Sequence, residues 1–299
     1  MRELLARLAQ DAAPAAEAPA HGGDGAQAVL VDPLLALGTL ALGVLLWTAL
    51  AGPLRRVLLG PGPAPARPVA GWWMLELFTV TFAVFVGATL AMLLTEPLGT
   101  WPLRGLVATD LALLGGVALA VVLARRVSPT GPAGAVRALG FQAPLGIGRE
   151  AAYGGLALVL AAPLLVGVLL LAPWVLDLFG HEARTQEVLR EILDMTGPSL
   201  VAAVVLATVV GPVLEEVLFR GFVQPACVDR VGPAGGVVFT AVLFASIHGL
   251  DAFLPLTGLA LLLGLLRYHT AGLTAPVLVH CLWNGATLAV ALSGAVEVP

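Results

Sequence analysis

Long apolar runs, separated by short polar or Gly/Pro-rich connectors, fill the chain from about residue 33 to residue 294. Within these runs apolar and polar residues do not alternate, as they would in the strands of a membrane β-barrel. Each run is close to the ~20 residues that a helix needs to cross a bilayer. The pattern therefore predicts about eight transmembrane helices, at about residues 33–53, 71–95, 104–124, 151–177, 199–223, 235–250, 254–270 and 273–294.

Two segments depart from this pattern. Residues 1–28 are rich in Ala, Pro and Gly and contain no apolar core, which predicts a disordered tail. In the stretch 181–196, apolar residues recur at helical spacing among charged ones, namely Val188, Leu189, Ile192 and Leu193. This stretch predicts a short amphipathic helix at the membrane interface.

Composition supports an integral membrane protein of the all-α class. Of the 299 residues, 59% are hydrophobic and only 11% are charged, whereas soluble domains carry about 25% charged residues. The formal net charge of −4 offers no basic patch for nucleic acid, so no nucleic-acid partner is expected. All basic residues are Arg, and Ala, Gly and Pro are abundant, which indicates a GC-rich and bacterial coding bias. The expected location is the cytoplasmic membrane of a bacterium.

Arginines predict the orientation of the chain in the membrane. The connectors after the first, third, fifth and seventh spans contain most of them, namely Arg55, Arg56, Arg67, Arg125, Arg126, Arg137, Arg149, Arg230 and Arg267. The connectors on the opposite side contain Arg104, Arg184 and Arg190. Because cytoplasmic loops carry the excess of basic residues, this distribution places the first set in the cytoplasm and both termini outside.

An acidic pair, Glu215 and Glu216, interrupts the apolar run 199–223. Each charged side chain at the centre of a bilayer costs about 2.5–3.5 kcal/mol, so such residues usually face a bundle interior or a wet cavity. Arg220 shares a helix face with Glu216, whereas Glu215 points about 100° away. A neutralising ion pair accounts for Glu216 only, so we expect the two glutamates to have different roles.

Two later spans carry histidines with a second residue one helical turn away, Phe244 with His248 and His280 with Asn284. Packing or hydrogen bonding between helices would explain each residue separately. If they meet the acidic pair, a carboxylate and a histidine can deprotonate a water molecule, and the second histidine and the asparagine can stabilise an oxyanion. Asp110 stands isolated in the third span, which indicates a paired or interfacial residue.

The three motifs together resemble those of a known family. Glu215-Glu216-x-x-x-Arg220, Phe244-x-x-x-His248 and His280-x-x-x-Asn284 are similar, in this order, to the motifs of the CPBP family. This family contains CAAX proteases and bacteriocin-processing enzymes, also called Abi proteins, and is related to type II CAAX prenyl endopeptidases. The resemblance covers residues 199–294, which we take as a catalytic core behind the N-terminal transmembrane helices at 29–198.

The resemblance implies an eight-helix intramembrane endopeptidase whose site opens toward the cytoplasm. Its partners would be membrane lipid and a membrane-associated protein or peptide substrate. Glu215 would activate water with His248, and Glu216 and Arg220 would support them. His280 and Asn284 would form the oxyanion site. Phe244 is the candidate substrate-binding residue, with ordinary packing as the alternative.

The need for a metal stays open at this stage. The family is commonly described as metalloproteases, and a metal-independent glutamate mechanism has also been argued for it. Glu215, His248 and His280 would be the ligands of a divalent metal such as zinc. The H-E-x-x-H motif is absent, so no cofactor is certain.

Other classes of function also use buried acids and histidines. A proton-coupled transporter would do so, but it favours inverted repeats and broken helices across the whole chain, and neither is evident. A non-catalytic scaffold or immunity protein of the same fold is a further alternative. One geometric conflict remains: His248 comes late in the span 235–250, several ångströms from the depth expected for Glu215, unless that span begins near Phe239.

Overall fold

The computed structural model describes residues 33–60, 74–95, 103–127, 139–181, 183–184 and 186–294, and the regular secondary structure in these ranges is helical. The predicted tail at residues 1–28 lies outside them. Within the described residues, six helical segments are long and apolar enough to cross a membrane, and Thr79–Leu94 is a shorter apolar helix. The all-α membrane fold is confirmed.

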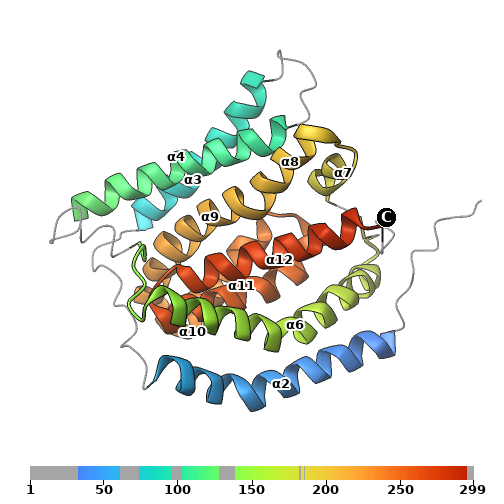
Figure 1. Cartoon of the computed structure of the whole chain (residues 1–299). Helices are drawn as coiled ribbons and strands as arrows, with labels where there is room; N and C mark the ends of the chain where they lie inside the picture. The colour runs from blue at the N-terminus through green and yellow to red at the C-terminus, as the bar shows by residue number, and fades with distance from the viewer. Residues whose placement is uncertain are drawn as a thin grey trace, which may run out of the picture. The chain divides into compact units, whose positions relative to one another are not determined.

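The N-terminal half contributes α2 (Pro33–Leu59), α3 (Met74–Thr95), α4 (Arg104–Val127) and α6 (Ile147–Leu178). Helix α2 packs along α6, and α3 packs along α4 (Figure 1). Gly167 lets α6 approach the backbone of α2, because an added Cβ there would lie 2.6 Å from the Leu40 nitrogen. Small residues bring membrane helices together in this way, since lipid supplies no hydrophobic driving force between them.

The C-terminal half begins with the short helix α7 (Glu187–Leu193). One long helical run follows, made of α8 (Gly197–Val205), η2 (Leu206–Val210), α9 (Gly211–Glu216), η3 (Val217–Val223) and α10 (Gln224–Ser246), and then come α11 (Leu250–Thr270) and α12 (Thr274–Leu292). The segments η2 and η3 are π-helical. The run changes direction inside α10 at Gly232, whose φ of 78° and ψ of 171° are non-helical and suit only glycine.

Each of the eight expected spans overlaps a helix, but the number of long apolar segments differs from the expected number. The spans expected at 199–223 and 235–250 belong to the single run Gly197–Ser246 because helical hydrogen bonding continues up to the turn at Gly232. The span expected at 71–95 lies on α3, a helix of 22 residues. The predicted amphipathic helix is α7, and its Ile192 is buried with Leu103 and Leu288.

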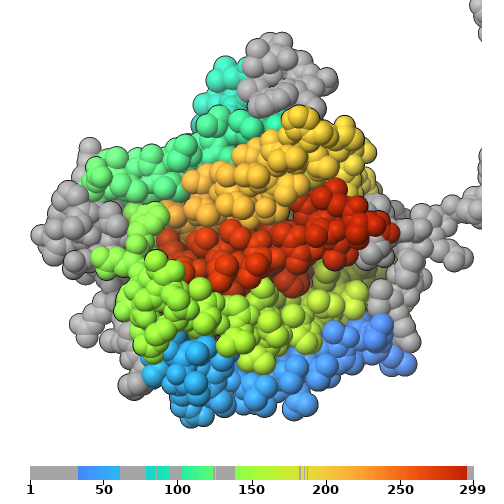
Figure 2. Space-filling view, viewed as in Figure 1, coloured from blue at the N-terminus to red at the C-terminus, as the bar shows by residue number. Residues whose placement is uncertain are grey.

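Helix α12 is the element that joins the two halves around the candidate site. It lies between α6 on one side and the α8–α9 run on the other (Figure 2). Helix α11 packs against α6, α10 and α12. The interior formed by these helices contains buried polar side chains of α9, η3, α10 and α12, namely Glu216, Arg220, Gln224, Thr240 and His280.

Candidate active site

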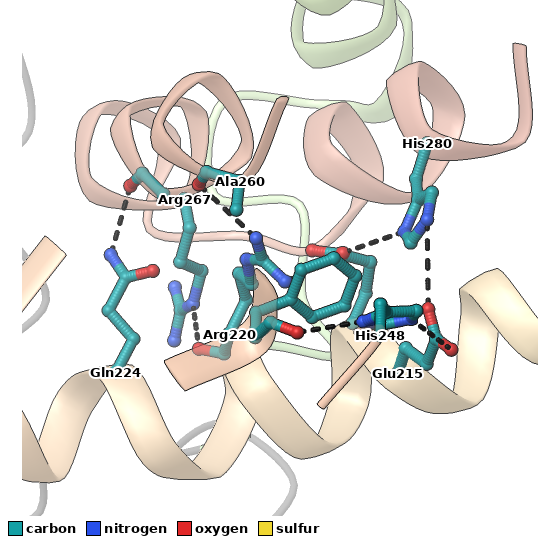
Figure 3. Close-up of polar contacts among 10 residues, drawn as sticks. Glu215, Arg220, Gln224, His248, Ala260, Arg267 and His280 are labelled. Carbon is teal, nitrogen blue, oxygen red and sulfur yellow. Dashed lines mark hydrogen bonds and ion pairs between the residues drawn. The ribbon is translucent and has the colours of Figure 1, made fainter. Parts of the chain in front are cut away.

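The residues of the three motifs come from segments far apart in the chain, and the structure brings them together (Figure 3). Glu215 and Glu216 close α9, and Arg220 lies one turn later on η3. His248 occupies the turn after α10, and His280 projects from α12. The expected convergence of these side chains is thus present in the fold.

Glu216 occupies the inner part of the site. Its Oε1 lies 3.1 Å from Arg220 Nη1 and 2.9 Å from His280 Nδ1, and the Glu216 and Arg220 side chains are 0% exposed. Arg220 Nη2 also donates to the Ala260 carbonyl of α11 at 3.2 Å. Close contacts of this kind are needed to offset the desolvation of two buried charges. The cluster links α9, η3, α11 and α12.

Glu215 occupies the outer part of the site. Its Oε1 lies 3.8 Å from His248 Nε2, and its Oε2 lies 3.7 Å from His280 Nε2. The side chains of Glu215 and His248 keep 18% and 26% of their surface exposed, unlike the buried Glu216. Water can therefore reach Glu215 and His248, whereas the Glu216 carboxylate is closed off from it.

Hydrogen bonds assign the protons on the two imidazole rings. His248 Nδ1 lies 2.7 Å from the Phe244 carbonyl oxygen, which only accepts, so Nδ1 carries the hydrogen. His280 Nδ1 faces the Glu216 carboxylate and donates to it at 2.9 Å. In the neutral rings both Nε2 atoms are then acceptors. A water molecule, with two hydrogens to donate, fits between such a nitrogen and the Glu215 carboxylate.

Phe244 is packed into the centre of this cluster. It is 1% exposed. Its ring centroid lies 4.6 Å from that of His248 and 5.8 Å from that of His280. The Arg220 guanidinium carbon lies 4.8 Å from the same centroid, where a cation–π contact is favourable. These contacts favour packing and positioning over a direct contact between Phe244 and a substrate.

Asn284 contacts the π-helix η2 before the acidic pair. In η2 the Gly211 N–H bonds to the Leu206 carbonyl, five residues back. The next residue is Pro212, which has no N–H to offer the Ala207 carbonyl. Asn284 Nδ2 donates to that carbonyl at 3.1 Å. One Asn284 N–H therefore holds η2, the segment that leads into α9, and the amide has a second N–H for another acceptor.

The π-helix η3 after the acidic pair repeats this arrangement. The Gln224 N–H bonds to the Phe219 carbonyl, five residues back, and the next residue, Pro225, again has no N–H. The Arg220 carbonyl is instead bonded by Arg267 Nε of α11 at 3.0 Å (Figure 3). The sequence spacing did not identify Arg267, because its partner is a carbonyl that only the π-helical register sets free.

Replacement of Arg267 tests this role of η3. We expect Arg267→Met to lower the free energy of unfolding by about 1–3 kcal/mol, the cost of leaving a buried acceptor unpaired. Adding Pro225→Ala to Arg267→Met supplies an N–H within reach of the Arg220 carbonyl and should restore part of the loss. The measurement is unfolding of the purified variants in mixed micelles.

A matched control for this rescue is Pro255→Ala, which removes another proline inside a helix, in α11. This change should not offset Arg267→Met. Equal rescue by both alanines would mean that any proline removal stabilises the chain, and the proposed exchange of hydrogen bonds at the Arg220 carbonyl would be wrong.

Comparison with known proteins places this site in a family. Residues 197–286 match the Rce1-like family of type II CAAX prenyl endopeptidases. The match contains all three motifs and covers less than a third of the chain. The resemblance seen in the motifs is confirmed for this Rce1-like segment. Searches of curated proteins and of solved structures gave no match.

Asp110 of α4 lies outside the Rce1-like segment and yet reaches its acidic helix. An added Cβ on Gly211, the first residue of α9, would lie 3.4 Å from Asp110 Oδ1. The other oxygen, Oδ2, is buried without a hydrogen-bond partner among the described residues. A carboxyl group in an apolar run was the available sequence signal. The contact of Asp110 with α9 depends on how α4 packs against α9, which the spacing of residues along the sequence does not reveal.

A cavity of about 700 Å³ leads to the outer part of the Rce1-like site. Residues of the segment 184–190 line one wall, and Ile247, His248 and Asp251 line the other. Asp251 holds the walls together, since it accepts a hydrogen bond from the Arg184 backbone N–H at 2.9 Å and lies 3.1 Å from His181 Nε2. His248 is the site residue that this cavity exposes.

The Rce1-like site does not meet the requirements of a metal centre. Among the described residues, no group of three or more His, Cys, Asp or Glu side chains is arranged to hold a metal ion. The set expected from the sequence, Glu215, His248 and His280, has each histidine Nε2 facing the carboxylate at 3.7–3.8 Å. We therefore derive the chemistry of the site from these side chains alone.

Proposed function

We propose that the protein is an intramembrane endopeptidase that hydrolyses a peptide bond of a membrane-associated protein or peptide with a water activated by Glu215 and His248. One observation carries this proposal. A partly exposed carboxylate faces two imidazole Nε2 atoms, with a buried carboxylate–arginine pair directly behind them. The match to the Rce1-like family supports protease activity independently of this geometry.

Attack by water is the first step of the proposed reaction. The water donates one hydrogen to the Glu215 carboxylate and the other to the neutral His248 Nε2. As its oxygen bonds to the scissile carbonyl carbon, one proton passes to Glu215 and the carbonyl π electrons move onto oxygen. A carboxylate and an imidazole held in this way act as general base and orienting group.

The oxyanion that forms needs hydrogen-bond donors. His280, when protonated, donates from Nε2, and its positive charge lies between Glu215 and Glu216. Asn284 would supply its second N–H, while its first holds the Ala207 carbonyl. Donors fixed in advance are worth several kcal/mol in a site closed to bulk water. The tetrahedral intermediate collapses when Glu215 returns its proton to the leaving nitrogen and the C–N bond breaks.

The direct test of this function is a search for new N-termini in membranes. Cells that express the wild-type chain should contain peptide termini that are missing from cells that express Glu215→Gln at the same level. Both samples are compared by quantitative N-terminal proteomics of the membrane fraction. If the two sets of termini are identical, the chain does not cleave membrane proteins in that cell.

The cavity beside His248 gives a separate prediction about substrate access. Val188 of α7 lines the cavity and is 45% exposed. We expect Val188→Trp to narrow the cavity and to lower kcat/KM for a protein substrate about tenfold or more, mainly through KM, because a narrower entrance weakens substrate binding and leaves the reacting groups in place. Val201→Trp on α8, at a position that is 65% exposed and away from the cavity lining, is the control. Equal kinetics of the two variants would exclude the cavity as the access route.

A further inference from the structure

The described helices have two ends with very different arginine content. At one end, Arg149 of α6 donates from Nε and Nη2 to the Leu58 carbonyl of α2 at 3.0 and 2.6 Å. Tyr153 of α6 also bonds to His269 of α11 at 2.9 Å. The C-termini of α2 and α11 and the N-terminus of α6 therefore meet there. We call this the arginine-rich end.

Successive long helices run in opposite directions, so the position of each other arginine along its helix shows at which end it lies. The first turn of α4, α7, the start of α8 and the end of α12 share one buried cluster, which defines the opposite, α7 end. The far end of α4 and the turn of the long run at Gly232 then belong to the arginine-rich end. It carries the arginines 55, 56, 125, 126, 149, 230 and 267, whereas Arg104, Arg184 and Arg190 lie at the α7 end.

The cavity of the candidate site belongs to the α7 end. Its walls are the segment 184–190, next to α7, and the turn between α10 and α11 that contains His248. Hydrogen bonds from Arg184 and His181 to Asp251 tie the segment after α6 to the first turn of α11. Water that reaches His248 through this cavity therefore enters from the α7 end.

We infer that the site opens on the non-cytoplasmic side of the membrane. Arginines in short connectors next to spans are retained in the cytoplasm, and here they gather at the end opposite the cavity. On the proposed function, the substrate is then an exported peptide or the outer segment of a membrane protein. This orientation is the reverse of the cytoplasmic opening that the family resemblance implies, and it reconciles the arginine pattern with the position of the cavity.

Two exposed glutamines allow a matched test of this orientation in intact bacterial cells. Gln186 lines the cavity at the α7 end, and Gln142 lies in the connector before α6 at the arginine-rich end. Each is changed to Cys in a full-length chain that carries Cys227→Ala and Cys281→Ala. A membrane-impermeant maleimide is added before or after the cells are permeabilised. Ile247→Cys, on the opposite cavity wall, is a second reporter if Gln186→Cys does not accumulate.

The inference expects full labelling of Gln186→Cys in intact cells and a severalfold rise for Gln142→Cys after permeabilisation. Labelling of Gln142→Cys alone in intact cells would overturn it. Because labelling needs no catalysis, this result stands apart from the proposed protease activity. The termini found by proteomics give the second readout: cleavage on the cytoplasmic side refutes the inferred orientation, whereas the absence of Glu215-dependent termini refutes the function and leaves the labelling result to decide the orientation.

Discussion

Glu215→Gln should reduce cleavage by about 10²–10⁴-fold, the usual contribution of a general base, while the variant accumulates in the membrane like the wild type. Glutamine keeps the shape and hydrogen-bonding ability of the side chain, but it cannot accept the proton of the attacking water. Glu215 is 18% exposed, and its histidine partners lie at 3.7 and 3.8 Å. Its replacement therefore leaves no tightly paired charge without a partner.

The measurement compares turnover of one membrane substrate with the amount and thermal stability of the enzyme in the same membranes. Glu191→Gln on α7 is the matched control, because it makes the same chemical change at an exposed position away from the cavity lining. If Glu215→Gln cleaves as fast as this control, Glu215 is not the base. If it fails to accumulate, Glu215 has the structural part that we assign to Glu216.

The positions of the helices could be predicted from the sequence, because few backbone conformations satisfy all their hydrogen bonds inside a bilayer. Apolar runs in lipid must satisfy their hydrogen bonds internally, so their lengths predicted the helices directly. The turn inside α10 was harder to predict from the sequence. The Gly-Pro pair at Gly232 and Pro233 indicated a connector between two spans, but the helix before it continues through residues 224–231. Local sequence cannot say how far a helix extends beyond the membrane.

The continuation of the helix through residues 224–231 also explains why Glu215 and His248 lie at the same depth. Glu215 lies sixteen residues before Val231, and His248 lies sixteen residues after Gly232, on the two sides of the turn. Both therefore lie the same number of residues from it, along two helical segments that lead away from the turn. They meet at the same level because the first helix is longer than expected, and a later start of the second near Phe239 is not needed.

Within the site, contacts at one-turn spacing could be predicted and contacts between helices could not. The pairing of Glu216 with Arg220 is such a local contact, and the structure confirms it. His280 and Asn284 share a helix face, yet their partners differ: His280 bonds to Glu216, and Asn284 to the Ala207 carbonyl. These partners depend on helix packing and on π-helical register, neither of which a spacing rule contains.

Glu216→Gln should lower both stability and activity, in contrast to Glu215→Gln. The change leaves the Arg220 guanidinium, which is 0% exposed, without its counter-charge. Breaking a buried pair on one side costs about 3–5 kcal/mol. The amide oxygen of glutamine still accepts a hydrogen bond from His280 Nδ1, but it no longer stabilises a positive charge on that ring. Activity per folded molecule should therefore fall as well.

A double-mutant cycle separates the cost of the unpaired charge from that of lost contacts. Arg220→Met alone leaves the buried Glu216 carboxylate without its arginine, with the hydrogen bond from His280 Nδ1 still in place, whereas Glu216→Gln with Arg220→Met removes both charges together. The double variant should be less destabilised than the sum of the single variants, because each single variant leaves one buried charge behind and the double variant leaves neither. Unfolding in mixed micelles measures the three free energies. Additive losses would show that the two side chains stabilise the fold independently, so the buried pair would not be the unit that holds His280 and η3 in place behind Glu215.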